Sequence, residues 1–162
     1  MIMANKLMLN TFIEEDFDLI AIHCSLEAYH LSFLLNKTLN FRLHREDMDV
    51  DFTYKEGTAF YELFKYCDDY QQCNYYLVEN KHKIKASNLY SEGSLFKGHA
   101  TYSTNLIPEY KNVDFFLKIE NEGSHIDSKK IISELHKITP IITAYKVDFD
   151  TLKSVENLTF SC

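Results

Sequence analysis

Two carboxylates beside a proline are the residues of this sequence best placed to do chemistry. Glu109 and Asp114 lie within a predicted turn that Pro108 starts, and two carboxylates near such a turn could bind a cation or take part in acid-base chemistry. Both residue types also have structural uses at a turn, because their oxygens accept hydrogen bonds from nearby backbone N–H groups. The pattern favours the structural role and nominates Glu109 and Asp114 for mutation.

An acidic triplet copies part of a calcium loop. Asp47, Asp49 and Asp51 occupy its first three ligand positions. The sixth position needs a glycine for a sharp turn and the twelfth a glutamate, whereas this sequence has Phe52 and Thr58 there. The match fails. We expect the aspartates on the acidic face of a strand, where they would discourage unwanted pairing if that strand lies at an edge.

The cysteines carry no complete signature of a site. Cys67 and Cys73 flank a five-residue loop and could face each other across a hairpin, as a disulfide or half of a metal site would require. Cys24 follows His23, and His30 lies further along the following helix. A cysteine and a histidine in such positions suit nucleophilic catalysis, although a cysteine on an apolar strand is usually a core residue. We expect these cysteines and Cys162 to be thiols in a reducing compartment.

The remaining histidines and the four glycines are scattered. They form neither a metal-ligand spacing, nor a dinucleotide fingerprint, nor a phosphate loop. The sequence therefore assigns no catalytic residue, no metal and no cofactor.

The composition is that of one folded domain spanning residues 1–162. Hydrophobic residues make up 46% of the chain, with 12 phenylalanines and 11 tyrosines, which is enough to form one core. A formal net charge of −7 disfavours binding to nucleic acid or to an anionic membrane surface. No stretch reaches the roughly 18 apolar residues of a membrane span, and residues 1–10 lack the pattern of a signal peptide. We expect a cytoplasmic location.

Hydrophobic periodicity indicates strands at both ends and throughout the middle of the chain. The predicted strands are 17–24, 41–45, 48–54, 58–67, 73–79, 83–90, 100–107, 113–120 and 141–148, and the predicted helices are 26–39 and 127–139. Ser25 is the expected N-cap of the first helix, and Asn40 its expected end. Each helical segment is long enough to join parallel strands, so the sheet could be mixed at its flanks. We predict an α+β fold: a largely antiparallel sheet of six to eight strands with two main helices on one face.

The segment 106–120 combines the strongest turn signal with a strand pattern. Pro108 lacks a backbone donor and pushes Ile107 towards an extended conformation, so the preceding strand should end there and one helical turn should follow. One face of the next strand carries Val113, Phe115, Leu117 and Ile119, and the other carries Asp114, Phe116, Lys118 and Glu120. Phe116 is the odd member of the second set, and could lie under a helix or against a partner.

The same segment resembles the signature of a bacterial family named for the pattern I-P-E-x-x-x-V-D-Y. The matching residues are Ile107, Pro108, Glu109, Val113, Asp114 and Phe115. Segments 16–27, 34–36 and 142–148 also look like segments of that family. The resemblance implies a small single-domain bacterial protein, and it implies no activity because the family is defined by sequence alone. Phe115 replaces the signature tyrosine, so a role that needs its hydroxyl is not available here.

These observations favour a non-catalytic protein-interaction or adaptor module with an acidic surface that suits a basic or mixed-charge protein partner. The alternative is a small-molecule-binding protein or enzyme with a site over the sheet, formed by tyrosine and histidine side chains with Glu109 or Asp114. A homodimer through an exposed strand is compatible with either. A deep polar pocket would favour the alternative, and an exposed apolar patch including Phe116 or the central tyrosines would favour the adaptor.

Overall fold

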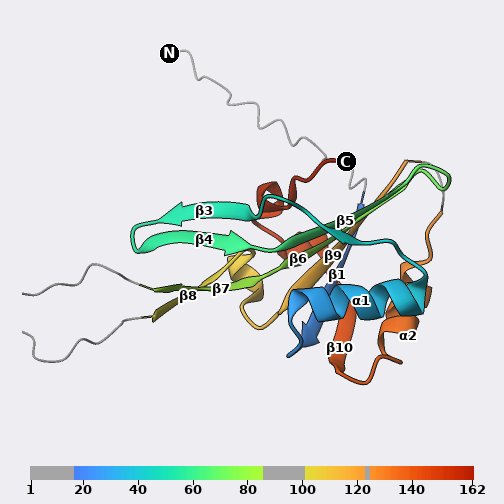
Figure 1. The fold of residues 1–162 in the computed structure, drawn as a ribbon, viewed down its shortest axis with the longest axis horizontal. Helices are drawn as coiled ribbons and strands as arrows, with labels where there is room; N and C mark the ends of the chain where they lie inside the picture. Colours follow the sequence, from blue (N-terminus) through green and yellow to red (C-terminus); the bar gives the residue numbers. More distant parts are fainter. Residues whose placement is uncertain (1–16, 86–100, 123–124) are drawn as a thin grey trace, which may run out of the picture.

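The computed structural model describes residues 17–85, 101–122 and 125–162. It has the predicted α+β architecture, with two helices beneath a twisted sheet and two hairpins that extend from one end of it (Figure 1). The helices are α1 (Ala28–Leu39) and α2 (Ser128–Leu135). No helix in the described part of the chain is long and apolar enough to cross a membrane.

The main sheet has six strands. Their spatial order is β10 (Ile141–Lys146), β1 (Phe17–Cys24), β9 (Phe115–Asn121), β6 (Cys73–Glu79), β5 (Leu63–Asp68) and β2 (His44–Arg45). The two hairpins are β3 (Val50–Tyr54) with β4 (Gly57–Tyr61), and β7 (Lys81–Lys85) with β8 (Thr101–Asn105). Short 3-10 helices follow at η1 (Pro108–Tyr110), η2 (Phe149–Thr151) and η3 (Val155–Leu158).

The prediction that the sheet could be mixed at its flanks is wrong, because every strand pair among the described residues is antiparallel. The connection through α2 does join two strands of the same direction, β9 and β10, but β1 lies between them and pairs with both. The connection through α1 leads to β2 at the far edge, where it pairs with β5. Crossover length alone therefore did not determine which strands become neighbours.

The element boundaries differ from the prediction in a few places. The predicted strand 58–67 is two strands separated at Glu62, because β4 pairs with β3 and β5 pairs with β6. The predicted strand 83–90 begins at Lys81, and its last five positions lie outside the described residues. The N-cap of α1 is Glu27 rather than Ser25, and Asn40 ends the helix in a left-handed conformation, as predicted, with φ of 57°.

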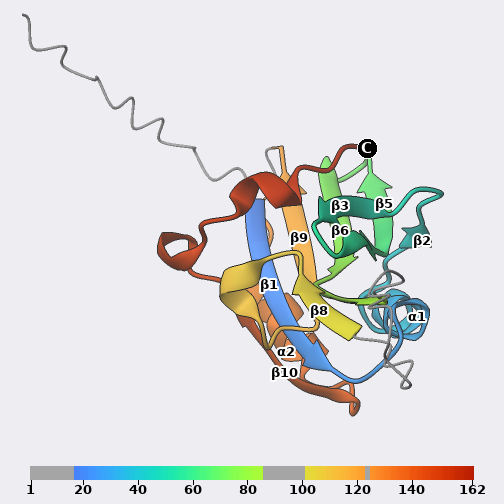
Figure 2. The same ribbon diagram turned by 90° about the vertical axis from the view of Figure 1, so that its left-hand side faces the viewer.

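The sheet buries both of its faces. On one face Ile22, Leu77 and Leu117 pack against both helices, whose inward residues include Leu31 and Leu135. The opposite face is covered by the hairpins, the loop 106–114 and the segment 152–162. In Figure 2 this last segment, in red, crosses the ends of β1 and β9 on the side away from the helices. The molecule thus has three layers, with the helices confined to one of them as predicted.

Because both faces of the sheet are covered, side chains on both faces of β9 are buried. Phe116 is fully buried and its ring lies edge-on to that of Tyr110, so it is covered by the chain's own loop. Lys118 is also buried. Val113 lies before the strand begins and packs with Phe116, on the face opposite Phe115, which contradicts the predicted alternation.

Candidate functional site

The loop 106–114, which contains five of the six signature residues, is held in shape by a residue outside it. Asn80 lies between β6 and β7 and is fully buried. Its side-chain amide donates to the carbonyls of Tyr110 (2.8 Å) and Val113 (2.9 Å), and its side-chain oxygen accepts from the N–H of Ile107 (2.8 Å). The main chain of Asn80 bonds both ends of the loop, at Leu106 (2.9 Å) and Asp114 (2.9 Å). One side chain therefore satisfies three main-chain groups of the loop, as buried N–H and C=O groups require.

Glu109 connects this loop to the segment 152–162. Its Oε1 accepts from the N–H groups of Lys153 (2.6 Å) and Ser154 (2.7 Å), and its Oε2 accepts from the hydroxyl of Ser154 (3.0 Å). Burial acts to raise the pKa of Glu109, but hydrogen bonds to its carboxylate outweigh that effect and hold the pKa below its ordinary value. Glu109 is therefore an ionised clamp for another part of the chain.

Asp114 has a comparable role at the other end of the loop. Its Oδ2 accepts from the N–H of Cys24 (3.0 Å), and its Oδ1 accepts from Lys81 Nζ (2.7 Å). The side chain thus joins the ends of β1 and β9 to the start of β7. In the described part of the chain Glu109 and Asp114 share no partner, so the structure does not bring them together as one carboxylate pair.

The other signature residues are structural. Pro108 occupies the start of η1, as predicted. Ile107 and Val113 are buried on the face away from the helices. Phe115 is buried on the helix face among apolar side chains, where the hydroxyl of a tyrosine would need its own hydrogen-bond partner.

The structure separates Cys24 from His23. Neighbouring strand residues point to opposite faces, and Cys24 is buried under the helices while the His23 ring is 3.2 Å from the Tyr145 hydroxyl. Burial raises the pKa of the Cys24 thiol, which disfavours the reactive thiolate. The Cys-His arrangement that the sequence allowed is not formed.

The expectation of four thiols is wrong for two of them. Cys67 forms a disulfide with Cys162, with Cα atoms 6.2 Å apart. Cys67 lies opposite Asn74 in the β5–β6 hairpin, and Cys73 lies opposite Asp68, so the pair that flanks the loop does not meet. A partner 95 residues away could not be found from local spacing.

The sequence pattern did not indicate that one lysine of β9 is buried. The Lys118 side chain is only 6% exposed, and its Nζ donates to the carbonyl of Leu158 (2.9 Å) and forms an ion pair with Glu120. Three aromatic rings surround the ammonium group: Phe17 at 4.6 Å, Tyr76 at 5.5 Å and Phe160 at 5.7 Å. Such rings attract a cation. The only signal in the sequence was a lysine inside an apolar strand, flanked by Leu117 and Ile119.

A cleft of about 750 Å³ lies beside the start of α2. Its lining includes Asp18, Asn121, His125, Ser128, Lys129 and Lys146. Lys146 forms an ion pair with Asp18 (2.6 Å). The volume suits a small molecule, and the mixed charges show no preference for one sign.

The outward face of α1 carries two exposed aromatic side chains. Tyr29 is 68% exposed and Phe33 is 61% exposed, and residues four apart lie side by side on a helix. The His30 ring stacks on Tyr29, with ring centroids 6.3 Å apart. The inward face of the same helix supplies the core residues Leu31 and Leu35. The packing of this helix against its own sheet therefore does not require the aromatic pair.

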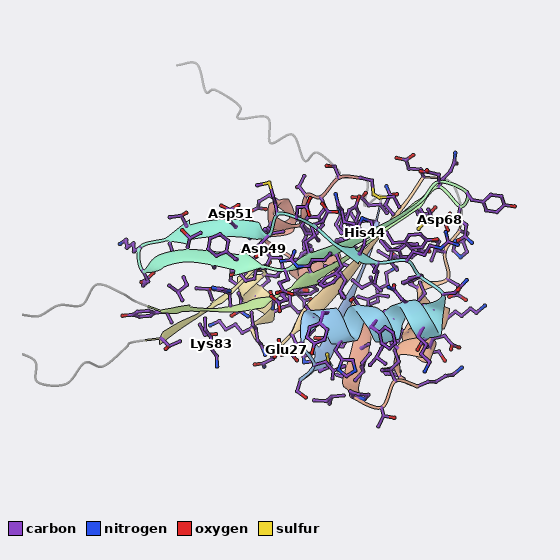
Figure 3. The ribbon with its side chains drawn as sticks, viewed as in Figure 1. Glu27, His44, Asp49, Asp51, Asp68 and Lys83 are labelled. Carbon is purple, nitrogen blue, oxygen red and sulfur yellow. A yellow bond between two sulfur atoms is a disulfide. The ribbon has the colours of Figure 1, made fainter. Side chains whose placement is uncertain are left out.

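Carboxylates gather near the start of α1. Burial, followed by the negative charges of Glu62, Glu27 and Asp49, raises the pKa of Glu79 to about 7, against one opposing hydrogen bond from the N–H of Glu62. Figure 3 shows Glu27 at the first turn of α1 and Asp49 on the segment above it. Arg45 pairs with both Asp49 and Glu62, so among the described residues Glu27 is the exposed and uncompensated carboxylate of this group next to the aromatic pair.

The predicted acidic strand face is present only in part. Asp51 is exposed, whereas Asp49 forms an ion pair with Arg45. Among the described residues no group of three or more histidine, cysteine, aspartate or glutamate side chains is placed to hold a metal ion.

These features define an α+β protein whose sheet is covered by helices on one face and by its own hairpins and closing segment on the other. Comparison of the chain with protein-family models, with curated proteins and with solved structures finds no match in any of the three. The chemistry of its surfaces is therefore the basis for a functional proposal.

Proposed function

We propose that this protein is a non-catalytic interaction module that binds a protein partner through α1. The observation that carries the proposal is the pair of exposed aromatic side chains, Tyr29 and Phe33, side by side on one helix. Aromatic residues supply much of the binding energy at protein interfaces, and an exposed apolar cluster marks an interaction site more often than single exposed residues do. The site differs from the patch expected from the sequence, because Phe116 and the central residues Tyr75 and Tyr76 are buried.

The charge beside this surface specifies the chemistry of the partner. Glu27 is exposed and precedes Tyr29 by two residues, whereas Asp49 and Glu62 are paired with Arg45. The whole chain has a net charge of −7. A partner with an apolar patch bordered by lysine or arginine would match both properties. The proposal includes a cytoplasmic location, and membership in the bacterial family that the signature residues resemble.

Paired variants would test the α1 surface. We expect the double substitution Tyr29→Ser with Phe33→Ser to abolish capture of the partner recovered with the wild-type protein from native cells. The thermal unfolding midpoint should be preserved, because neither side chain is buried. The matched control is Tyr70→Ser, since Tyr70 is 96% exposed and lies at the tip of the β5–β6 hairpin. Equal capture by the double variant and the wild type would refute the proposal, as would equal loss in the control.

The cleft beside α2 supports a second candidate function, the binding of a small molecule. The observation that favours this function is a cleft volume of about 750 Å³ with lysine, histidine and serine side chains in the lining. This location differs from the one expected from the sequence, because Glu109 and Asp114 are engaged elsewhere. A metabolite library screened by thermal shift against wild type and Lys129→Ala would identify a ligand of this cleft. Equal stabilisation of both proteins by a ligand would show that this ligand does not bind in the cleft.

A further inference from the structure

The segment 152–162 crosses the face of the sheet away from the helices, and we call it the strap. Its first part is held by buried, non-covalent contacts. Leu152 and Leu158 are buried in the core of that face, and Glu109 accepts from the main chain at residues 153 and 154. The side-chain amide of Asn157 donates to the carbonyl of Leu106 (2.8 Å). These contacts fix the strap as far as Leu158.

The last four residues of the strap are held differently. Thr159, Ser161 and Cys162 are exposed, and Phe160 is half-buried. Besides the disulfide, the strap is attached here by Lys65 Nζ donating to the carbonyl of Ser161 (2.7 Å), and by the Phe160 ring, 5.4 Å from that of Tyr76. Because an exposed hydrogen bond and one partly buried ring contribute little, the Cys67–Cys162 bond is the main attachment of residues 159–162.

Beneath these residues lies the Lys118 amine. Phe160 contributes one of the three rings around its Nζ, and Cys162 Sγ lies 3.5 Å from the hydroxyl of Tyr76, which donates to Glu120 (3.1 Å). The strap therefore covers an ammonium group, a carboxylate and a phenol. Leu158, whose carbonyl accepts from Lys118 Nζ (2.9 Å), belongs to the part of the strap that buried contacts hold. Release of residues 159–162 would therefore remove the Phe160 ring from the ammonium group and leave its bond to Leu158 in place.

We propose that the Cys67–Cys162 disulfide is a redox-controlled latch, and that its reduction frees residues 159–162 and removes the Phe160 ring from one side of the Lys118 ammonium group. A thiolate of an external dithiol attacks Cys162 Sγ or Cys67 Sγ, which breaks the S–S bond and forms a mixed disulfide. The second thiol of the reductant then displaces the bound cysteine. Two electrons pass to the protein, both cysteines take up a proton to become thiols, and the dithiol leaves as a disulfide.

The accessibility of the two cysteines supports this chemistry. Cys162 is exposed and Cys67 is partly exposed, so a reductant can reach the bond without unfolding of the core. Cys24 and Cys73 are buried thiols. In a reducing compartment, disulfides are mainly of the transient and regulatory kind. The latch lies on the sheet face opposite α1, so it does not depend on the proposed docking surface.

The experiment measures acylation of lysines by N-hydroxysuccinimidyl acetate, with mass spectrometry of the oxidised protein and of the protein reduced by dithiothreitol. We expect labelling of Lys118 to rise at least about five-fold on reduction, because amine reactivity follows exposure. Labelling of Lys83, which is exposed on the β7 hairpin far from the strap (Figure 3), should not change. Cys67→Ser and Cys162→Ser should each give the reduced pattern without reductant, and should not respond to it.

Two results would overturn the proposal. Lys118 labelling that is the same in oxidised and reduced wild type would show that the strap remains in place without the bond. Reaction of Cys24 and Cys73 with N-ethylmaleimide in the reduced protein, at the rate seen in urea, would show general unfolding rather than release of a latch. If both cysteines stay protected while Lys118 becomes reactive, the opening is confined to the strap.

Discussion

At the scale of single residues, Asn80 contributes more to the shape of the loop 106–114 than the carboxylates of Glu109 and Asp114 do. Glu109 bonds one other part of the chain, at residues 153 and 154, and Asp114 bonds two, at Cys24 and Lys81. Asn80 instead bonds main-chain groups within the loop 106–114 itself. An asparagine side chain can donate and accept at once, so it can bind carbonyls and an N–H group of the same loop. No aspartate or glutamate could replace it in that arrangement when ionised.

We expect Asn80→Ala to lower the free energy of unfolding by about 3 kcal/mol, because it leaves the N–H of Ile107 and the carbonyls of Tyr110 and Val113 buried without their partner. Urea unfolding followed by circular dichroism measures the change. Asn112→Ala, in the same loop at an exposed position, should stay within about 0.5 kcal/mol of wild type. Equal effects in the two variants would contradict the role given to Asn80.

At the scale of elements, the two hairpins depend on close contact with each other. Gly57 begins β4 with φ of 145°, and a Cβ atom at this position would lie 2.9 Å from Cγ2 of Ile84 in β7. Both the backbone conformation and the neighbouring methyl group therefore require glycine. This contact helps to stack the β3–β4 hairpin on the β7–β8 hairpin, as Figure 1 shows.

Gly57→Ala is expected to destabilise the protein by about 1–3 kcal/mol, since the new methyl group meets Ile84 and φ is unfavourable for alanine. Hydrogen exchange should accelerate in β3 and β4 more than in β1 and β9. Glu56→Ala changes the adjacent exposed residue and should leave exchange as in wild type. Uniform acceleration in every strand of Gly57→Ala would show that the hairpins are not a separable unit.

The sheet edges also bear on assembly. β2 has only two residues, and on β10 the N–H of Ala144 donates to Nε2 of His136 (3.2 Å). A side chain that occupies an edge donor discourages strand addition. The described edges therefore give less support to a homodimer through an exposed strand than the sequence pattern suggested.

At the scale of the whole molecule, negative charge and burial combine at Glu79. Its pKa rises from 4.5 to about 7 in the folded protein, so the folded state holds this proton more tightly than the unfolded state does. Below the unfolded pKa both states are protonated and no difference arises. As the pH rises from 4.5 to 7 the folded state loses stability, because Glu79 ionises in the unfolded state while burial and the neighbouring negative charges keep it protonated in the folded state.

We expect Glu79→Gln to be more stable than wild type by about 1 kcal/mol at pH 8, after allowance for solvent screening of a partly exposed group. The advantage should vanish near pH 4.5. Thermal unfolding of both proteins across this range measures the difference, with Glu56→Gln, at an exposed hairpin turn, as control. A difference that does not depend on pH would show that removal of the charge is not the cause.

Much of the fold was predictable because the signals are local. The mostly apolar run 17–24, the aromatic-rich run 73–79, the helical spacing in 26–39 and the Pro108 turn each depend on a few neighbouring residues. The strap was not predictable in the same way. The side-chain hydrogen bonds that attach it to the rest of the chain join residues 40 to 96 positions apart, as in Lys118 with Leu158 and Lys65 with Ser161. The disulfide and the burial of Lys118 depend on such distant pairs. The hydrogen bonds of Glu109 and Asp114 do so too, and hydrophobic periodicity does not encode contacts of this kind.

The strand order has a consequence for how the chain reaches this structure. β1 is the first described strand, and its two neighbours, β9 and β10, come from the last third of the sequence. The β5–β6 hairpin can close from local contacts, whereas the centre of the sheet must wait for a loop of nearly a hundred residues to close, which is slow. On the ribosome, Leu19, Ile20 and Ile22 therefore remain without their strand partners until β9 has emerged. This is the period in which the nascent chain is most exposed to aggregation and most in need of a chaperone.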